Sequence, residues 1–163
     1  GVSFPGCTLE IIGDGPSKPY VDGLRGLVRE LGVDAVVHWH GQVTDAVQFE
    51  TRLAGFGVAL CLYNSTPDVP SWYQLPGKVY AYAACGLPTV AADTIGPVGV
   101  REIEGPKIGL VTPLDDFENC MGRLFGDPAL HRTLSDNAEK WAAAYDWSDK
   151  FETHLAAPRK DAG

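Results

Sequence analysis

Short apolar runs alternate with segments of helical periodicity along almost the whole chain. The apolar runs are four or five residues long and bounded by glycine, proline or polar residues, which predicts strands. These strands cover residues 9–12, 35–39, 58–62, 89–92 and 108–111. Apolar residues recurring every three or four positions predict helices at about residues 19–31, 45–53, 78–85, 100–103, 115–125, 128–145 and 147–155. The alternation is typical of an α/β fold, a parallel sheet flanked by helices.

The loops that follow the predicted strands are the natural place for a ligand. In parallel α/β sheets, ligands bind beyond the carboxyl ends of the strands. The corresponding loops are residues 13–16, 40–44, 63–78, 93–99 and 112–116, and we expect them to line one cleft. The longest, residues 63–77, contains three prolines and is predicted to have no regular structure.

Residues 70–92, PSWYQLPGKVYAYAACGLPTVAA, combine a loop, a helix and a buried strand. Leu75-Pro76-Gly77 ends the loop, and a helix is predicted to begin at Lys78. The free N–H groups and positive dipole end of a helix N-terminus, beside a lysine, suit an anion such as phosphate. A solvated lysine on an ordinary surface helix is the alternative, and both interpretations are open.

Length and charge narrow the choice of function. The 163 residues predict one domain over residues 1–155, followed by a frayed tail at residues 156–163. A formal charge of −8 and a pI near 4.8 argue against a surface for nucleic acid or anionic lipid. Any phosphate of a ligand must therefore be bound by local groups.

The four cysteines, Cys7, Cys61, Cys85 and Cys120, are far apart and form no C-x-x-C motif. They are interpreted as small buried hydrophobes in a reducing compartment, not as a disulfide frame or a zinc site. No run is long and apolar enough for a membrane span, and no signal peptide precedes the first strand. These features together predict a cytoplasmic protein.

Six segments, in order, carry a resemblance to a known family. They are LEIIGDGP (9–16), LVRELGV (27–33), WHGQV (39–43), LPGKVYAYAACGLPTVA (75–91), IGLVTPLDD (108–116) and AEKWAAAYDW (138–147). Together they resemble the C-terminal, nucleotide-sugar-binding half of retaining group 1, family 4-like glycosyltransferases of GT-B architecture. The resemblance covers nearly the whole chain and implies a Rossmann-like domain, one half of a GT-B fold.

The resemblance also implies an activity and its partners. The expected donor is a nucleoside diphosphate sugar, and the acceptor, a glycan, lipid or small molecule, would be held by an N-terminal domain that this sequence does not include. No cofactor or metal is expected, and no nucleic acid. Peripheral membrane association of the complete protein is a further expectation. The fragment alone is expected to be inactive.

Substrate-binding roles follow from the resemblance position by position. The glycines let the chain approach the ligand, the loop from His40 to Val43 lies near the nucleobase, and the helix beginning at Lys78 points at the diphosphate. No catalytic residue is identified, and transfer would depend on stabilising the departing diphosphate. The implied substrate-binding residues are Gly13, Gly15, His40, Gln42, Val43, Tyr73, Gln74, Leu75, Gly77, Lys78 and Glu102.

The chain departs from the family at two places. The pair of glutamates that commonly holds the ribose hydroxyls falls on Tyr73 and Ala81, neither of which is a carboxylate. The family also begins this half with a strand and a helix that supply an Arg and a Lys, whereas only residues 1–6 precede Cys7. Because Tyr73 and Ala81 replace the glutamate pair, a non-catalytic binding or scaffolding module stays open as the alternative function.

Other candidate features allow two interpretations each. Gly13-Asp14-Gly15 suggests a dinucleotide site, but the third glycine is absent. His38 and His40 would share one strand face, yet no nearby carboxylate or cysteine completes a metal site, so satisfied or solvent-facing histidines are expected. Trp72 and Tyr73 either stack on a ring of the ligand or pin their loop.

Four further positions, all in predicted helices, are interpreted as follows. Glu102 either contacts substrate or caps the short helix. Trp141, Tyr145 and Trp147 are spaced for packing and are predicted to belong to the core.

Overall fold

The structure, a computed structural model, describes residues 4–15, 17–63 and 66–145. The chain divides into two compact units, Gly1–Arg52 and Leu53–Gly163, and each is described by itself. The predicted domain boundary at residue 155, the helix at 147–155, the frayed tail and Trp147 all lie outside the described residues.

The first unit is built on two parallel strands. β1 (Leu9–Ile12) has the predicted bounds, and β2 (Val37–Gly41) pairs with it in the register Leu9↔Val37 and Glu10↔His38. The prediction of 35–39 for this second strand is wrong by two residues. The Val36 amide donates to the Val33 carbonyl, so the chain is still turning where the apolar run begins, and the ladder starts only at Val37.

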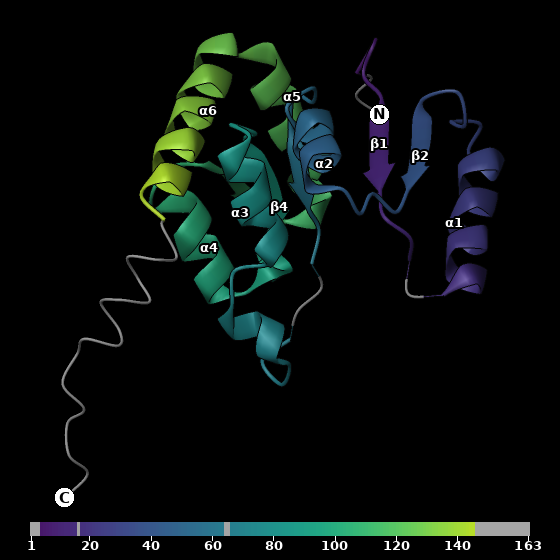
Figure 1. The fold of residues 1–163 in the computed structure, drawn as a ribbon, viewed down its shortest axis with the longest axis horizontal. Helices are drawn as coiled ribbons and strands as arrows, with labels where there is room; N and C mark the ends of the chain where they lie inside the picture. The colour runs from purple at the N-terminus through teal and green to yellow at the C-terminus, as the bar shows by residue number, and fades with distance from the viewer. Residues whose placement is uncertain (1–3, 16, 64–65, 146–163) are drawn as a thin grey trace, which may run out of the picture. The chain divides into compact units, whose positions relative to one another are not determined.

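Two helices complete the first unit (Figure 1). α1 (Lys18–Glu30) joins β1 to β2, and α2 (Ala46–Leu53) follows β2. Gly32, with φ +65°, follows Leu31, the C-cap residue of α1. No described residue before Leu53 is fully buried, so this unit has no fully enclosed core among its described residues.

The second unit contains a parallel sheet in the order β3-β4-β5. Its strands are β3 (Ala59–Cys61), β4 (Thr89–Ala92) and β5 (Gly109–Thr112). All four residues of the central strand β4 are buried, which confirms the prediction of an apolar strand covered on both faces. The parallel α/β class is thereby confirmed, with the ladders of the described residues forming two sheets.

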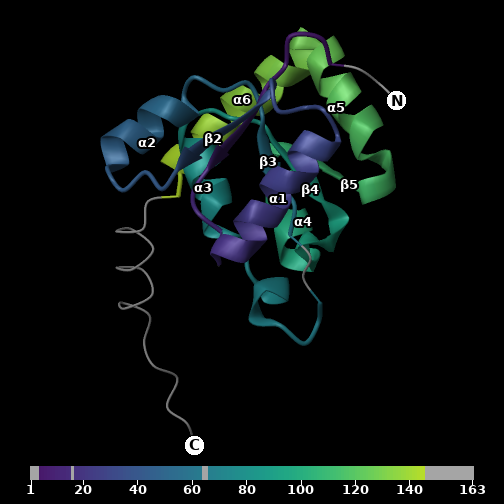
Figure 2. The same ribbon diagram turned by 90° about the vertical axis from the view of Figure 1, so that its right-hand side faces the viewer.

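Helices cover both faces of this three-stranded sheet (Figure 2). Ala91 of β4 packs in one core cluster and its neighbour Val90 in the other, as expected for alternating sides of a strand. α3 and α4 contribute to the first cluster and α5 to the second, whereas α6 contributes Ala138 to the first and Leu134 to the second. The helix bounds are α3 (Gly77–Ala84), α4 (Pro97–Glu104), α5 (Phe117–Gly126) and α6 (Pro128–Ala143).

Three short 3-10 helices lie in loops. η1 (Pro70–Tyr73) corrects the prediction that the long loop has no regular structure, because the Trp72 amide donates to the Val69 carbonyl and closes a tight turn. η2 (Asp93–Ile95) precedes α4, which begins earlier than predicted because proline suits a first helical position. η3 (Leu114–Asp116) leads into α5.

The predicted packing of Trp141 and Tyr145 is confirmed. Both contact Tyr80 of α3, with ring centroids 5.3 Å and 4.8 Å away, and the Tyr80 hydroxyl donates to the Tyr145 hydroxyl at 3.1 Å. Burial and this hydrogen bond raise the pKa of Tyr80. The aromatic cluster thus joins α6 and the residues just after it to α3.

The cysteines are all free, but their burial differs from the prediction. Cys61 and Cys120 are buried as expected, and Cys85 is half-buried. Cys7 is exposed, because it precedes β1 and packs in neither core cluster. Among the described residues, no helix combines the length and apolar character that crossing a membrane requires.

Candidate functional site

The start of α3 presents Gly77 and Lys78 to solvent between buried residues. Leu75 and Pro76 before them are buried, and Val79 after them is completely buried in the core. The Val79 amide already donates to the Pro76 carbonyl at 2.9 Å. Gly77 and Lys78 therefore contribute amides that the helix itself leaves without a partner. A rigid, exposed helix start of this kind suits an anion.

The ammonium group of Lys78 lies at the carboxyl end of the three-stranded sheet. Its Nζ is 4.8 Å from the centroid of the Tyr63 ring, just beyond β3. The Tyr63 carbonyl accepts a 2.6 Å hydrogen bond from the Thr94 hydroxyl, which follows β4. Tyr63 and Thr94 thus connect the ends of two adjacent strands beside the lysine, and the Tyr63 ring holds its cation over that edge.

A buried thiol lies near the same lysine without neutralising it. Cys61, at the end of β3, is completely buried. Burial raises the pKa of Cys61 to about 11, while the positive charge of Lys78 acts in the opposite direction. The thiol is therefore uncharged at neutral pH, and the charge of Lys78 is available to an external anion.

The loop before α3 is fixed by its own contacts. The Tyr73 hydroxyl donates to the Pro67 carbonyl at 3.2 Å, which supports the pinning role, and the residue stays exposed, which leaves stacking open. Gln74 is exposed. Leu75 is buried in the core beside Val79, so a contact with ligand would come through its backbone.

α3 offers no carboxylate in place of the family's glutamate pair, and the carboxylate of Glu102 on α4 is bound by its neighbour Arg101. Ala81 is half-buried on α3, which bears no acidic residue. Glu102 lies in the last turn of α4 and accepts hydrogen bonds from Arg101 Nε and Nη2 at 3.2 and 3.0 Å. The capping interpretation of Glu102 is wrong, because the helix begins at Pro97, after Gly96.

In the first unit, the local backbone and packing explain why glycine is needed at the two predicted ligand-binding positions, Gly13 and Gly15. Gly13 has φ +119°, which side chains rarely adopt, and its amide donates to the Gly41 carbonyl at 2.8 Å. A Cβ on Gly15 would lie 2.7 Å from Cγ2 of Val21. The turn after β1 is thereby tied to the end of β2, where Gln42 is exposed and Val43 half-buried.

A carboxylate lies beside both histidines of β2, contrary to the sequence prediction. Glu10 Oε1 is 2.7 Å from His38 Nδ1 and Oε2 is 2.6 Å from His40 Nε2. The interpretation of satisfied histidines is confirmed. Hydrogen bonds lower the pKa of Glu10 to about 2; the bond from Thr8 has the largest effect, and His40 and His38 supply the others. No group of three His, Cys, Asp or Glu residues in the described part of the chain is arranged to hold a metal ion.

Sequence reasoning missed Glu10 and also Arg52, whose Nη1 lies 3.0 Å from His40 Nδ1. The available signal was alternation: Glu10 on one strand and His38 and His40 on the next occupy one face of the parallel pair. A cleft formed by loops of both units remains a prediction.

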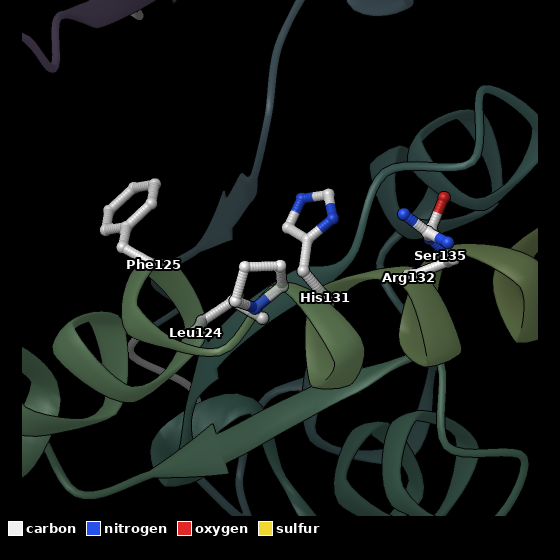
Figure 3. A pocket seen from close by; sticks show the side chains of 6 residues that line it. Leu124, Phe125, His131, Arg132 and Ser135 are labelled. Carbon is white, nitrogen blue, oxygen red and sulfur yellow. The ribbon is translucent and has the colours of Figure 1, made fainter.

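A separate hollow lies at the corner between α5 and α6 (Figure 3). Its volume is about 380 Å³, and it is lined by Leu124, Phe125, Pro128, His131, Arg132 and Ser135. His131 Nε2–H donates to the Gly57 carbonyl, before β3, and the Ser135 hydroxyl donates to the Gly86 carbonyl, before β4, each at 2.7 Å. The hollow is therefore at the amino ends of the strands, opposite the end where Lys78 lies, and it contains none of the predicted site residues.

Comparison with known proteins identifies the family and the fold. Residues 3–127 match the family model described as "Glycosyl transferases group 1". A search of curated protein sequences finds no match.

Among solved structures, HepE of Anabaena in complex with UDP is similar with a TM-score of 0.72 at 23% identity, over 93% of this chain and 40% of that one. The C-terminal domain of the group 1 family protein LpcC from Francisella tularensis gives a TM-score of 0.69 at 14% identity, over 87% of this chain and 71% of that one. Sucrose-phosphate synthase from Thermosynechococcus elongatus gives 0.66 at 22% identity, over 91% of this chain and 38% of that one. The chain thus spans about two fifths of the length of HepE and of the synthase.

Proposed function

The chain belongs to the group 1 glycosyl transferases, and we propose that it is the half of such an enzyme that binds a nucleoside diphosphate sugar. In this proposal the sugar is transferred, with retention of its anomeric configuration, to an acceptor held by an N-terminal domain. The acceptor is a glycan, a lipid or a small molecule, and no cofactor takes part.

One observation carries the proposal: the exposed start of α3 at the carboxyl ends of β3 and β4. Gly77 and Lys78 offer two amides and an ammonium group at one point, and the buried residues on either side hold that point in place. A diphosphate bound there would meet the positive end of the helix dipole. Because the chain has a net negative charge, this local arrangement has to supply the attraction.

The same groups account for the chemistry. In the transfer, the bond between the anomeric carbon and the diphosphate oxygen breaks, the acceptor oxygen bonds to that carbon, and the acceptor's hydroxyl proton passes to the departing diphosphate. Negative charge grows on the departing diphosphate. Donors that are already oriented toward this charge stabilise the transition state more than the ground state. Lys78 and the amides of Gly77 and Lys78 are assigned this role.

The complexes of HepE support the choice of ligand for a first test. HepE has been crystallised with UDP and with UDP-glucose, and it shares the fold of this chain. We therefore take UDP as the first probe and GDP as the second. The base and the sugar used by this chain are outcomes of that test.

Calorimetric titration of the chain with UDP, GDP and their sugars tests the proposal. We expect saturable binding of one nucleotide, weakened about 10- to 100-fold in Lys78→Ala, because a hydrogen bond to a charged group contributes ~1.5–3 kcal/mol. Lys140→Ala, an exposed lysine in the last turn of α6, is the matched control and should leave the affinity unchanged.

Ala81 favours one second candidate, a non-catalytic module of the same fold. A methyl group cannot accept hydrogen bonds from the ribose hydroxyls. If no nucleotide binds, even with an N-terminal acceptor domain restored, the donor-site proposal fails and the module is supported.

A further inference from the structure

We propose that Tyr63 and Thr94 are positioning residues that hold the ammonium group of Lys78 where it can meet a diphosphate. This inference rests on the proposed function. Neither residue is assigned to contact the ligand: Tyr63 acts through Lys78, and Thr94 acts through Tyr63. All three residues belong to the second unit, so the arrangement needs nothing from the first.

The side chain of Lys78 depends on an aromatic contact for its position. Lys78 is exposed in the first turn of α3, and a lysine ammonium sits on a long, flexible stem. Among the described residues, no acidic side chain forms an ion pair with it. Its Nζ lies 4.8 Å from the centroid of the Tyr63 ring. The face of a ring attracts a cation and, unlike a carboxylate, leaves its charge unneutralised.

Tyr63 is itself held on two sides. Its side chain is half-buried and packs against the core cluster that contains Val79. Its carbonyl accepts a 2.6 Å hydrogen bond from the hydroxyl of Thr94, which lies in η2, just beyond the neighbouring strand β4. This bond is partly buried and has the usual length for a hydroxyl donor. Thr94 therefore fixes the backbone at the point where the chain leaves β3.

Cys61 and Tyr82, which interact electrostatically with this pair, are both uncharged at neutral pH. Burial raises the pKa of the Cys61 thiol, near Lys78, to about 11. Burial also raises the pKa of Tyr82, which interacts with Cys61 and Tyr63, to about 12. Neither side chain competes with an external anion for the ammonium group.

The placement of the ammonium complements that of the amides. The backbone amides of Gly77 and Lys78 are fixed by α3, whereas the ammonium is fixed only as far as Tyr63 holds it. A group that is oriented before the ligand arrives loses less entropy on binding. Tyr63 and Thr94 therefore raise the affinity for the diphosphate of a nucleotide and make no distinction between bases.

The test compares paired variants of the full chain. Tyr63→Leu removes the aromatic face, and Tyr63→Phe keeps it. Thr94→Val removes the hydroxyl that donates to the Tyr63 carbonyl, and Thr94→Ser keeps it. The control for Tyr63→Leu is Tyr20→Leu, at an exposed tyrosine of α1. The control for Thr94→Val is Thr133→Val, which removes a 2.8 Å bond from a hydroxyl to the Ala129 carbonyl within α6.

Ring-current shifts in proton NMR report the contact without any nucleotide. Side-chain protons of Lys78 that lie over the Tyr63 ring should be shifted upfield in the unaltered chain and in Tyr63→Phe. The shift should disappear in Tyr63→Leu, shrink in Thr94→Val and return in Thr94→Ser, and both controls should keep it. Lack of the shift in the unaltered chain would overturn the inference before any ligand is added.

Calorimetry with inorganic pyrophosphate and with UDP measures the effect on binding. We expect Tyr63→Leu to bind both about two- to fivefold more weakly, the contribution of one cation–π contact at an exposed site. Thr94→Val should show a smaller loss in the same direction, and Tyr63→Phe, Thr94→Ser and both controls should bind normally. In the Lys78→Ala background, Tyr63→Leu should cause no further loss, because Tyr63 acts only through the lysine.

The double variant separates positioning from the other roles of Tyr63. A loss in Tyr63→Leu that persists in the Lys78→Ala background shows direct contact with the ligand or general destabilisation, and overturns the inference. Unchanged affinity in Tyr63→Leu overturns it too, as does a Tyr63→Phe variant that binds as weakly as Tyr63→Leu. If Tyr63→Leu does not fold, Thr94→Val and Thr94→Ser decide by the same criteria.

The proposed function fails by a different result. In that case the unaltered chain shows the ring-current shift but binds neither pyrophosphate nor UDP, and the role of Tyr63 at a diphosphate is refuted with it. If the unaltered chain binds both and only Lys78→Ala weakens them, the proposed function stands and the positioning role of Tyr63 and Thr94 is refuted.

Discussion

Replacing Gly96 by alanine should release the loop that carries Tyr73 to Gly77. Gly96 lies between η2 and α4 with φ +91° and ψ 162°, a region that is essentially restricted to glycine. A Cβ there would lie 2.5 Å from the Trp72 carbonyl oxygen and 3.1 Å from the Trp72 Cα. Because Trp72 belongs to η1, the whole turn of the loop would have to move away from α4.

The magnitude follows from two costs. The unfavourable backbone conformation costs about 1–3 kcal/mol. The contact has to open from 2.5 Å toward an ordinary 3.4 Å against backbone atoms, and overpacking of this kind costs about 1–3 kcal/mol. We expect Gly96→Ala to lower the free energy of unfolding of the second unit by about 2–6 kcal/mol, a large part of the ~5–15 kcal/mol typical of a domain.

Amide hydrogen exchange of Val90 and Ala91 measures this loss, because both are completely buried in β4 and exchange only when the unit opens. Gly126→Ala is the matched control: Gly126 ends α5, nothing lies within 4 Å of its added Cβ, and protection should be equal or higher. The reasoning is refuted if Gly96→Ala reduces the protection of β4 no more than Gly126→Ala does.

Three further predictions concern charge, thiols and packing. Because the pKa of Glu10 is about 2 in the folded chain, below its ordinary 4.5, Glu10 stabilises the fold fully above pH 4.5, and this stabilisation is lost as the pH falls toward 2. The NMR signals of His40 should follow the protonation of Glu10 over this range, and Glu10→Gln should flatten their dependence on pH. An unchanged pH profile in Glu10→Gln would contradict the prediction. Iodoacetamide should modify the exposed Cys7 of the folded chain and spare Cys61, because burial raises the pKa of the Cys61 thiol to about 11. Peptide mass mapping identifies the modified cysteines, and early modification of Cys61 would contradict its burial. Ile103→Ala, at a completely buried position, should cost about 2–5 kcal/mol in urea unfolding, and a loss below 1 kcal/mol would argue against the packing of α4.

The sequence was sufficient for elements whose ends are marked locally. β1 and β4 have the predicted bounds, because turn residues close each apolar run. β2 was misplaced, since its start depends on pairing with β1 about 28 residues earlier in the chain and not on the apolar run itself. The 3-10 turn before α3 was missed because prolines in a loop indicate only that long helices and strands are absent.

In the candidate site, too, residues marked by a local signal could be predicted and residues placed by long-range pairing could not. Lys78 could be placed at a helix start because Leu75-Pro76-Gly77 is a local break signal, and the structure begins α3 within one residue of that prediction. Glu10 and Arg52 could not be found, because their link to His40 is set by the register of two strands and by the position of a helix.

The central claim, that the exposed start of α3 binds the diphosphate of a nucleotide, is tested most directly by NMR mapping. UDP is titrated into the ¹⁵N-labelled chain while the amide signals are followed. We predict saturable shifts at the amides of Gly77 and Lys78, abolished by Lys78→Ala. Shifts confined to the hollow between α5 and α6, or a saturated complex with the signals of Gly77 and Lys78 unmoved, would contradict the account.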